Sequence, residues 1–354
     1  MDRRVAAALV LARSAQCQHW ARSRPYLVEH IGMKRIAVIG AGIGGIALAS
    51  NHDVVVFEKG RGVGGRMASR YAHAFSFDHG AQYFTVRDPA FAALLAPALA
   101  AGAVAPWTGS IARIADGIMT DLAEPRDRHL VGVPNMNSAV KALADGLDVR
   151  LGVEIAPLRG HTRQGRHLTS TDGVDHGLFD WVVSTTTAHQ TMALFANNAP
   201  NEGALCATKM APCYALMLGF AEPIELPWIA ARVSGSPIDW IGINSTKPGR
   251  DTSCTTLVIH STSHWAQARL GQDIELLGVE LAQALHQATG IDPDLAVFRA
   301  IHRWASARRL PQPNSRPYID PLRQLAATGD WTSGSRVEDT VLSALDLADS
   351  IERE

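Results

Sequence analysis

The sequence predicts an α/β fold, α+β overall, with a Rossmann-like dinucleotide-binding unit and a second, strand-rich part. Three observations carry this prediction. The β-branched run 35–39 is typical of a buried parallel strand, and it leads directly into a glycine-rich turn. A second buried strand, 53–57, follows a short helical stretch and completes a βαβ unit. The stretch 214–262 alternates strands and turns, which indicates a separate sheet.

Composition and charge exclude several classes of protein. The 354 residues carry 33 Lys and Arg against 34 Asp and Glu, so a net charge of −1 provides no electrostatic footprint for nucleic acid. No apolar run approaches the roughly 20 residues that cross a bilayer. The four cysteines form no CxxC pair and no histidine spacing fits a metal site. We expect reduced, mostly buried thiols, no metal, a cytoplasmic location, and no nucleic-acid or membrane partner.

Residues 1–32 lack the periodicity of a core element. Arg3 and Arg4 precede a short apolar stretch, but no clear small-residue cleavage site follows it. We expect a disordered leader or a start codon assigned too early, with Met33 as the functional start. A secretory leader is the less favoured alternative.

Local signals place the other elements in order. Asp88 and Pro89 predict a helix to about residue 101, because Asp caps a helix and proline fits its first turn. The clearest helix covers 274–289, with Asp273 as its cap and Gly290 as its end. The remaining expected elements are a helix over about 137–145, strands at 149–155, 180–185, 214–220, 239–244 and 255–260, a final strand ending within 326–331, and a terminal helix over 337–351.

Gly40-x-Gly42-x-x-Gly45 has the spacing of a dinucleotide-binding turn. The first glycine permits the tight turn, and the second lets a pyrophosphate approach the backbone. The third lets helix and strand pack closely. The helix start, which includes Ile43 and Gly44, provides N–H groups and a positive dipole end for phosphate.

Glu58 ends the second strand, where a carboxylate can accept hydrogen bonds from both hydroxyls of an adenosine ribose. A solvated strand-end charge is the alternative. Glu58 follows Gly45 by only 13 residues, a shorter crossover than usual. The connecting helix has room for about two turns, roughly 12 Å, whereas a five-residue strand spans about 17 Å. This tight return is the main reason to question how strongly the chain holds a dinucleotide.

Lys59 and a glycine-rich loop follow this strand, and the loop ends in Gly64-Gly65-Arg66-Met67. A plain NAD-binding unit does not require a Gly-Gly-Arg segment here. On such a loop, Arg66 can meet a pyrophosphate with several donors at once. An ordinary basic surface loop is the alternative.

Together with FDHGAQYFT at 77–85, these motifs resemble the flavin amine oxidase superfamily, and specifically its renalase-like branch. The resemblance covers essentially Met33 to the C-terminus. Further segments agree in order: VGVPNMN at 131–137, PCY at 212–214, KPGR at 247–250, VIH at 258–260, HRW at 302–304 and GDW at 329–331.

The resemblance implies a Rossmann-like FAD-binding domain and an interleaved substrate domain built on a mostly antiparallel sheet. The FAD-binding domain would comprise 33–90, 128–190 and 320–354, and the substrate domain 91–127 and 191–319. No cysteine stands beside Asp330, so noncovalent FAD is implied.

The residues implied to contact FAD come from several segments. Arg66 would hold the pyrophosphate and Val153 would meet adenine. The helix opened by Arg336 and Val337 would stabilise negative charge at the flavin N1–C2=O side. The full set is Gly40, Gly42, Ile43, Gly44, Gly45, Glu58, Lys59, Gly65, Arg66, Met67, Gly80, Ala81, Gln82, Val153, Gly329, Asp330, Arg336 and Val337.

The resemblance also implies an FAD-dependent oxidase. A hydride would pass from a dihydropyridine, a 2- or 6-dihydro-NAD(P) isomer, to flavin N5, and O2 would reoxidise the flavin to give H2O2. The partners would be this small-molecule dinucleotide and O2; the oligomeric state is not predicted. Two alternatives stay open. One is oxidation of a small amine, which normally needs an aromatic cage, whereas 316–328 holds only Tyr318. The other is an FAD-binding protein with little turnover, which the short crossover favours.

Four residues are candidates for substrate contact, and no residue is expected to act as a nucleophile or strong base. Lys247 and Arg250 could meet a dinucleotide phosphate or lie on a solvated turn. His260 ends an apolar strand, where a core histidine is the commoner role. Trp304 could stack on a substrate ring or fill the core.

Overall fold

The computed structural model describes residues 34–50, 54–160, 165–200 and 203–354. The expected leader, 1–32, lies outside the described residues, as does Asp53 at the start of the expected second strand. Residues 34–354 group as one unit.

The glycine-rich turn joins two parallel strands through a short helix, as the sequence predicts. β1 (Ile36–Ile39) pairs in parallel with β2 (Val54–Glu58), and α2 (Ile43–Ala49) lies between them in the chain. All seven residues of α2 are buried. A Cβ on Gly44 would lie 3.0 Å from Thr340 Cγ2 on α10 (Val337–Arg353), so the two helices pack closely. The short crossover therefore forms the expected βαβ unit with a helix of about two turns.

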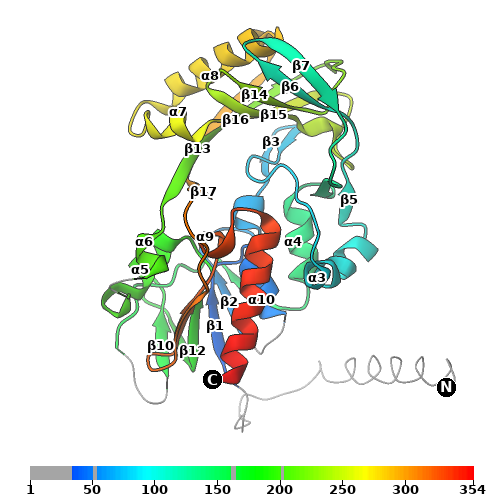
Figure 1. Cartoon of the computed structure of the whole chain (residues 1–354). Coiled ribbons are helices and arrows are strands. Elements are labelled where there is room, and N and C mark those ends of the chain that lie inside the picture. The colour runs from blue at the N-terminus through cyan, green and yellow to red at the C-terminus, as the bar shows by residue number, and fades with distance from the viewer. Residues whose placement is uncertain (1–33, 51–53, 161–164, 201–202) are drawn as a thin grey trace, which may run out of the picture. The chain divides into compact units, whose positions relative to one another are not determined.

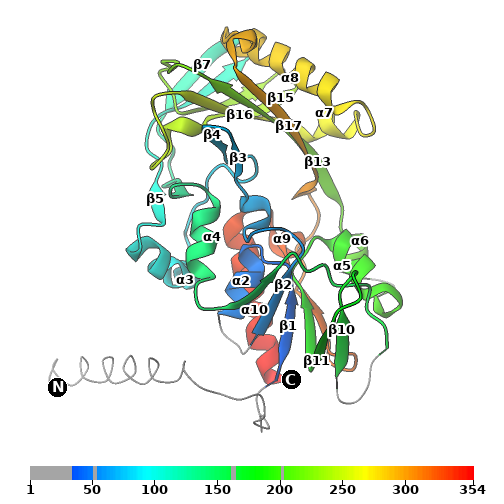
Figure 2. The same cartoon turned by 180° about the vertical axis from the view of Figure 1, so that it is seen from behind.

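This unit belongs to a six-stranded sheet of order β18-β19-β12-β1-β2-β9. Neighbouring strands are parallel except β18 and β19. Within β1, Ile36 and Val38 enter the core that contains α2 and α10, and Ala37 enters the core on the opposite face, so both faces are covered (Figures 1 and 2). The other strands are β9 (Asp148–Leu151), β12 (Trp181–Ser184), β18 (Tyr318–Asp320) and β19 (Leu325–Ala327).

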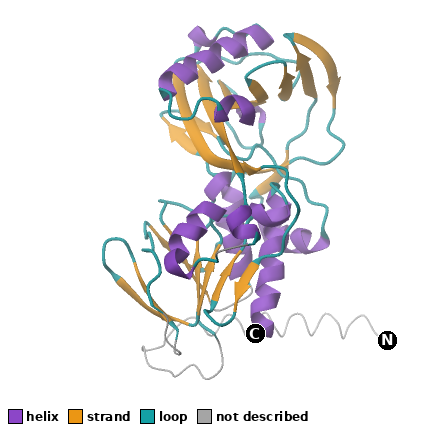
Figure 3. Cartoon of the chain, turned by 60° about the vertical axis from the view of Figure 1, so that its left-hand side comes forward, coloured by secondary structure: helices purple, strands orange, loops and turns teal. Residues whose placement is uncertain are grey.

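A second sheet has seven strands in the order β17-β13-β16-β15-β14-β6-β7. Only β14 and β6 pair in parallel, so this sheet is mostly antiparallel, as expected. α8 (Ile274–Thr289) buries Leu277, Leu281 and Leu285 against one face (Figure 3). The strands are β6 (Ile111–Ala115), β7 (Ile118–Ala123), β13 (Met210–Phe220), β14 (Ala230–Ser234), β15 (Ile238–Ile243), β16 (Thr255–Ser261) and β17 (Phe298–Arg309).

Capping residues begin and end the helices close to the predicted positions. Asp273 accepts hydrogen bonds from the N–H groups of Glu275 and Leu276, and Gly290 takes the left-handed conformation with φ 74°. Asp88 accepts from Ala90 N at 2.8 Å. The other elements are β3 (Arg70–Ala72), β4 (Phe75–Phe77), α3 (Pro89–Ala100), β5 (Val104–Pro106), β8 (Leu130–Gly132), α4 (Asn137–Leu143), β10 (Arg166–Thr169), β11 (Asp175–Phe179), α5 (Ala188–Phe195), α6 (Ala204–Ala207), α7 (Ser263–Gln267) and α9 (Asp330–Ser333).

Two expectations are corrected. The strand expected at 149–155 ends at Leu151, because the chain turns at Gly152 with φ 72°. The thiols of Cys206, Cys213 and Cys254 are free, but only Cys213 is buried, so the expectation of mostly buried cysteines is wrong for the described part of the chain. Cys206 is exposed because α6 turns its neighbour Leu205 inward instead.

Candidate functional site

The glycine-rich turn provides both a close contact and an open face. A Cβ on Gly45 would lie 2.0 Å from the Gly40 carbonyl oxygen, so the backbone here tolerates no side chain. A Cβ on Gly42 would meet no atom within 4 Å, although Gly42 is the N-cap of α2. The side of Gly42 is therefore open to an approaching group, as the dinucleotide spacing predicts.

Glu58 links the two loops that follow β1 and β2. Its carboxylate accepts hydrogen bonds from Ala41 N at 2.9 Å and from Gly60 N at 2.6 Å. A carboxylate has further lone pairs, so Glu58 can still accept from ribose hydroxyls. Val153 N donates to the Glu58 carbonyl at 3.0 Å, so the turn after β9 is held against the end of β2. Lys59 is exposed and pairs with Glu154 at 3.6 Å, away from these contacts.

Arg66 and Asp330 are brought together from distant parts of the chain. Arg66 Nη1 lies 2.6 Å from Asp330 Oδ2, and Nη2 lies 2.8 Å from Oδ1. Arg66 Nη1 also donates to the carbonyls of Ser306 and Ala307 on β17. Gly65, with φ 54°, turns the loop at this point, and Met67 is buried in the core beneath it. The two-point pair orients the guanidinium and leaves the Arg66 Nε–H outside it.

The loop 78–82 is held against the backbone of Arg66. Ala81 N donates to the Arg66 carbonyl at 2.9 Å, and a Cβ on Gly80 would lie 2.0 Å from the same oxygen. Gln82 is buried, and its Nε2 donates to the carbonyls of Asp78 and Gly80. Gln82 therefore fixes the shape of this loop.

Asp78 is a buried charged residue that the sequence did not single out. Its carboxylate, 0% exposed, pairs with Lys247 Nζ at 3.1 Å and Arg250 Nη2 at 2.5 Å. Burial raises the pKa of Asp78, but the two cations and hydrogen bonds from Met136 N and Ser69 outweigh it and lower the pKa to about 2. Burial lowers the pKa of Lys247 to about 8 against the opposing effect of Asp78.

This ion cluster corrects the alternative that Lys247 and Arg250 lie on a solvated turn. Their side chains are 0% and 2% exposed, and both are paired with Asp78. The only signal in the sequence was the aspartate inside the FDHGAQYFT segment, because a distant pairing leaves no local pattern.

His260 and Trp304 converge on one backbone oxygen. His260 Nε2 and Trp304 Nε1 donate to the His79 carbonyl at 3.0 and 2.9 Å. The His79 ring stacks on Trp304 at 5.2 Å, and His302 contacts both rings edge-on. Burial, followed by the charge of His302, lowers the pKa of His79 to about 4. Burial likewise lowers the pKa of His260 to about 4, so both rings are neutral near pH 7.

The start of α10, with Arg336 as its N-cap and Val337 as its first residue, carries acidic side chains. Its first turn carries Glu338 and Asp339, and Asp339 accepts from the Arg336 N–H at 3.2 Å. Glu338, which is buried, accepts from the N–H groups of Arg87 and Asp88. These carboxylates complement the dipole at this end of the helix.

The residues present fit FAD as the bound group. Gly42 opens on free space, Glu58 presents a carboxylate at the end of β2, and Arg66 is oriented by Asp330 next to Gly80 and Ala81. Gly329, whose Cβ would lie 2.9 Å from the Trp331 ring, lets the chain turn into α9 at Asp330. In the described ranges no group of three or more His, Cys, Asp or Glu side chains could hold a metal ion. No helix of those ranges combines the length and the hydropathy needed to cross a membrane.

The fold and this glycine turn are those of a Rossmann-like dinucleotide-binding domain. A family model described as an NAD(P)-binding Rossmann-like domain matches residues 38–97. A solved structure of a protein assigned as a protoporphyrinogen oxidase, from Exiguobacterium sp. 255-15, is similar with a TM-score of 0.71 and 14% identity, over 91% of this chain and 99% of that chain. Cyclohexylamine oxidase from Brevibacterium oxydans IH-35A gives 0.68 and 13%, over 90% and 100%. Putrescine oxidase bound to putrescine gives 0.64 and 11%, over 91% and 99%. At these identities the likeness shows a shared fold.

Proposed function

We propose that this protein is an FAD-dependent oxidoreductase that binds FAD noncovalently. The observation that carries the proposal is the convergence of the open Gly42, the Glu58 carboxylate and the Arg66–Asp330 pair beyond the carboxyl ends of β1, β2 and β19. The segments 33–90, 128–190 and 320–354 would form the FAD-binding domain, and 91–127 and 191–319 the substrate domain. Gly80 and Ala81 would lie beside the flavin ring, since they pack on the Arg66 backbone.

The preferred substrate is a dihydropyridine, a 2- or 6-dihydro-NAD(P) isomer. When bound, FAD supplies a two-electron acceptor that takes a hydride at N5 and is reoxidised by O2, which becomes H2O2. Loss of a hydride from a dihydropyridine forms an aromatic cation and needs no base. The groups around His79 suit such a reaction because they offer no free base. The rings of His79 and His260 are neutral near pH 7, and the Asp78 carboxylate is paired with Lys247 and Arg250. Trp304 and His79 would orient the flat ring.

Oxidation of a small amine is the second candidate, and one observation favours it. The rings of His79, His302 and Trp304 gather beside Gly80, where the Trp304 ring lies 3.4 Å from the position of a Cβ. Such a cluster could orient a neutral amine as well as a nicotinamide. It supplies aromatic rings in addition to Tyr318, the single aromatic residue of 316–328.

Anaerobic stopped-flow mixing tests the proposal through the loss of oxidised flavin absorbance. We expect fast reduction by 2- or 6-dihydro-NAD(P) isomers, and slow or no reduction by 4-dihydro NADH or a primary amine. Each 1.4 kcal/mol of better alignment is worth about tenfold in rate. Comparable rates for an amine and a dihydro-NAD isomer would favour the amine oxidase. Protein that purifies yellow but is reduced by none of these compounds would instead support an FAD-binding protein with little turnover.

A further inference from the structure

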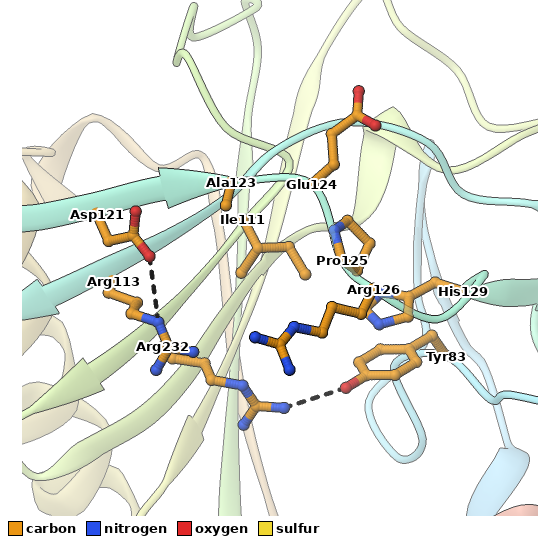
Figure 4. A pocket seen from close by; sticks show the side chains of 10 residues that line it. All are labelled: Tyr83, Ile111, Arg113, Asp121, Ala123, Glu124, Pro125, Arg126, His129 and Arg232. Carbon is orange, nitrogen blue, oxygen red and sulfur yellow. Dashed lines mark hydrogen bonds and ion pairs between the residues drawn. The ribbon is translucent and has the colours of Figure 1, made fainter.

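A cavity of about 510 Å³ lies beside the loop that follows Gln82. Its wall comes from β6, β7, β14 and the segments around Tyr83 and His129 (Figure 4). None of the residues placed at the cofactor site, Gly42, Glu58, Arg66 or Asp330, lines it. This cavity therefore needs an explanation of its own.

Three guanidinium groups from three segments face this cavity: Arg113 on β6, Arg126 after β7, and Arg232 on β14. Arg113 is paired with Asp121 at 3.5 Å, but neither Arg126 nor Arg232 has a carboxylate partner within the described part of the chain. Figure 4 shows the Arg126 and Arg232 side chains extending into the same space, while the Glu124 carboxylate turns away from them. The part of the cavity that both arginine side chains enter is therefore electropositive.

The wall around these arginines is organised rather than a loose surface. The Arg232 Nη2 donates to the Tyr83 hydroxyl at 3.1 Å, and its guanidinium lies 5.1 Å from the centre of the Trp240 ring. Tyr83 stacks on His129 with ring centres 3.6 Å apart and planes 14° apart. Two aromatic contacts therefore fix Arg232 and the cavity floor.

His129 is the second, independent indication of a ligand. Its residue is 7% exposed, it lines the cavity, and its Nδ1 has no hydrogen-bond partner among the described residues. Burial, followed by the charge of Arg232, lowers the pKa of His129 to about 4, so the ring is neutral near pH 7. A buried ring nitrogen without a partner is uncommon in a folded protein and indicates a missing polar group.

We propose that this cavity binds a small molecule through an oxyanion group, a carboxylate or a phosphate, held by Arg126 and Arg232. Guanidinium groups recognise both anions through paired, charge-assisted hydrogen bonds. The volume exceeds that of a single anion, so the ligand carries further atoms. The inference does not depend on the redox chemistry proposed above.

Isothermal titration calorimetry on the full-length, FAD-loaded protein tests this. The probes are inorganic phosphate, succinate and, as a neutral control, succinamide. We expect saturable binding of at least one anion that weakens with added salt, no binding of succinamide, and an unchanged flavin absorbance spectrum. Binding of phosphate alone would identify phosphate compounds as the ligand class, and binding of succinate alone would identify carboxylates.

Two variants and a control connect binding to the cavity. Arg126→Gln should lower the affinity for the anion about tenfold, because one charge-assisted contact is lost. Arg232→Gln should lower this affinity at least as much. Arg128→Gln, an exposed arginine of the same segment that does not line the cavity, should leave affinity unchanged. Failure of both anions to bind, or equal affinity in Arg126→Gln and Arg128→Gln, would overturn the proposal, and a thermal melt of each variant shows that it is folded.

Discussion

The guanidinium of Arg66 and the carboxylate of Asp330 form a two-point ion pair across 264 residues of sequence. Asp330 is 4% exposed at its side chain and Arg66 is 31% exposed, so the carboxylate is the buried partner. The pair connects the loop after β2 with the turn into α9. One end of the proposed pyrophosphate site is therefore built from both ends of the described chain.

Arg66→Lys should lower FAD affinity about tenfold while the protein stays folded. Lysine keeps the charge but cannot form the parallel pair of hydrogen bonds with Asp330, so the cation loses its fixed orientation. Fluorescence titration of flavin-free protein with FAD measures the change. Arg61→Lys, an exposed arginine of the same loop, is the matched control. Equal affinities in the two variants would show that Arg66 does not contact the cofactor.

Gly42→Leu should strip FAD from the protein without unfolding it. The space around Gly42 is open and its φ of −72° suits any residue, so the new side chain occupies the place of the ligand. Gly45→Ala should behave differently, because its Cβ would collide with the Gly40 carbonyl and destabilise the fold itself. Flavin content and the melting temperature of the flavin-free protein separate the two effects. A Gly42→Leu protein that purifies fully yellow would contradict the proposed site.

Local sequence patterns predicted much of the fold, but they could not predict contacts between residues far apart in the sequence. The ends of α8 could be predicted because Asp273 and Gly290 act through hydrogen bonds and backbone conformation within one turn. The βαβ unit likewise follows from a contiguous glycine spacing. Asp78 and Lys247 are 169 residues apart, and charged side chains are usually exposed, so no local pattern shows that they meet. The arginine-lined cavity was missed for the same reason.

Asp78→Asn should cost about 3–5 kcal/mol of unfolding free energy, because it leaves Lys247 and Arg250 buried without a counter-charge. Lys247→Met should cost less, since Asp78 keeps Arg250. Urea denaturation measures both. Asp121→Asn, which breaks an exposed pair with Arg113, should change stability by about 1 kcal/mol or less. A loss in Asp78→Asn no larger than that of Asp121→Asn would refute the structural role of the cluster.

Stability should fall on acidification from about pH 6.5 to pH 4. The pKa values of His79, His129 and His260 are lowered from 6.5 to about 4 in the folded protein, mainly by burial. Between these values the unfolded chain binds more protons than the folded one, so stability rises with pH across this window. Thermal melts at a series of pH values measure the slope. His260→Gln should reduce it, because the ring whose pKa is lowered is then absent. An unchanged slope in His260→Gln would mean that His260 already carries its proton when folded.

The position of β18 and β19 within the six-stranded sheet has a consequence for synthesis. These strands, the Asp330 partner of Arg66, and the helix α10 that packs on α2 all lie after residue 317. A nascent chain that has made only the glycine turn and Arg66 lacks the strands and the helix that cover them. The proposed cofactor site can therefore form only after the ribosome has translated the last segment, and we expect that termination before residue 318 yields a chain that cannot retain flavin.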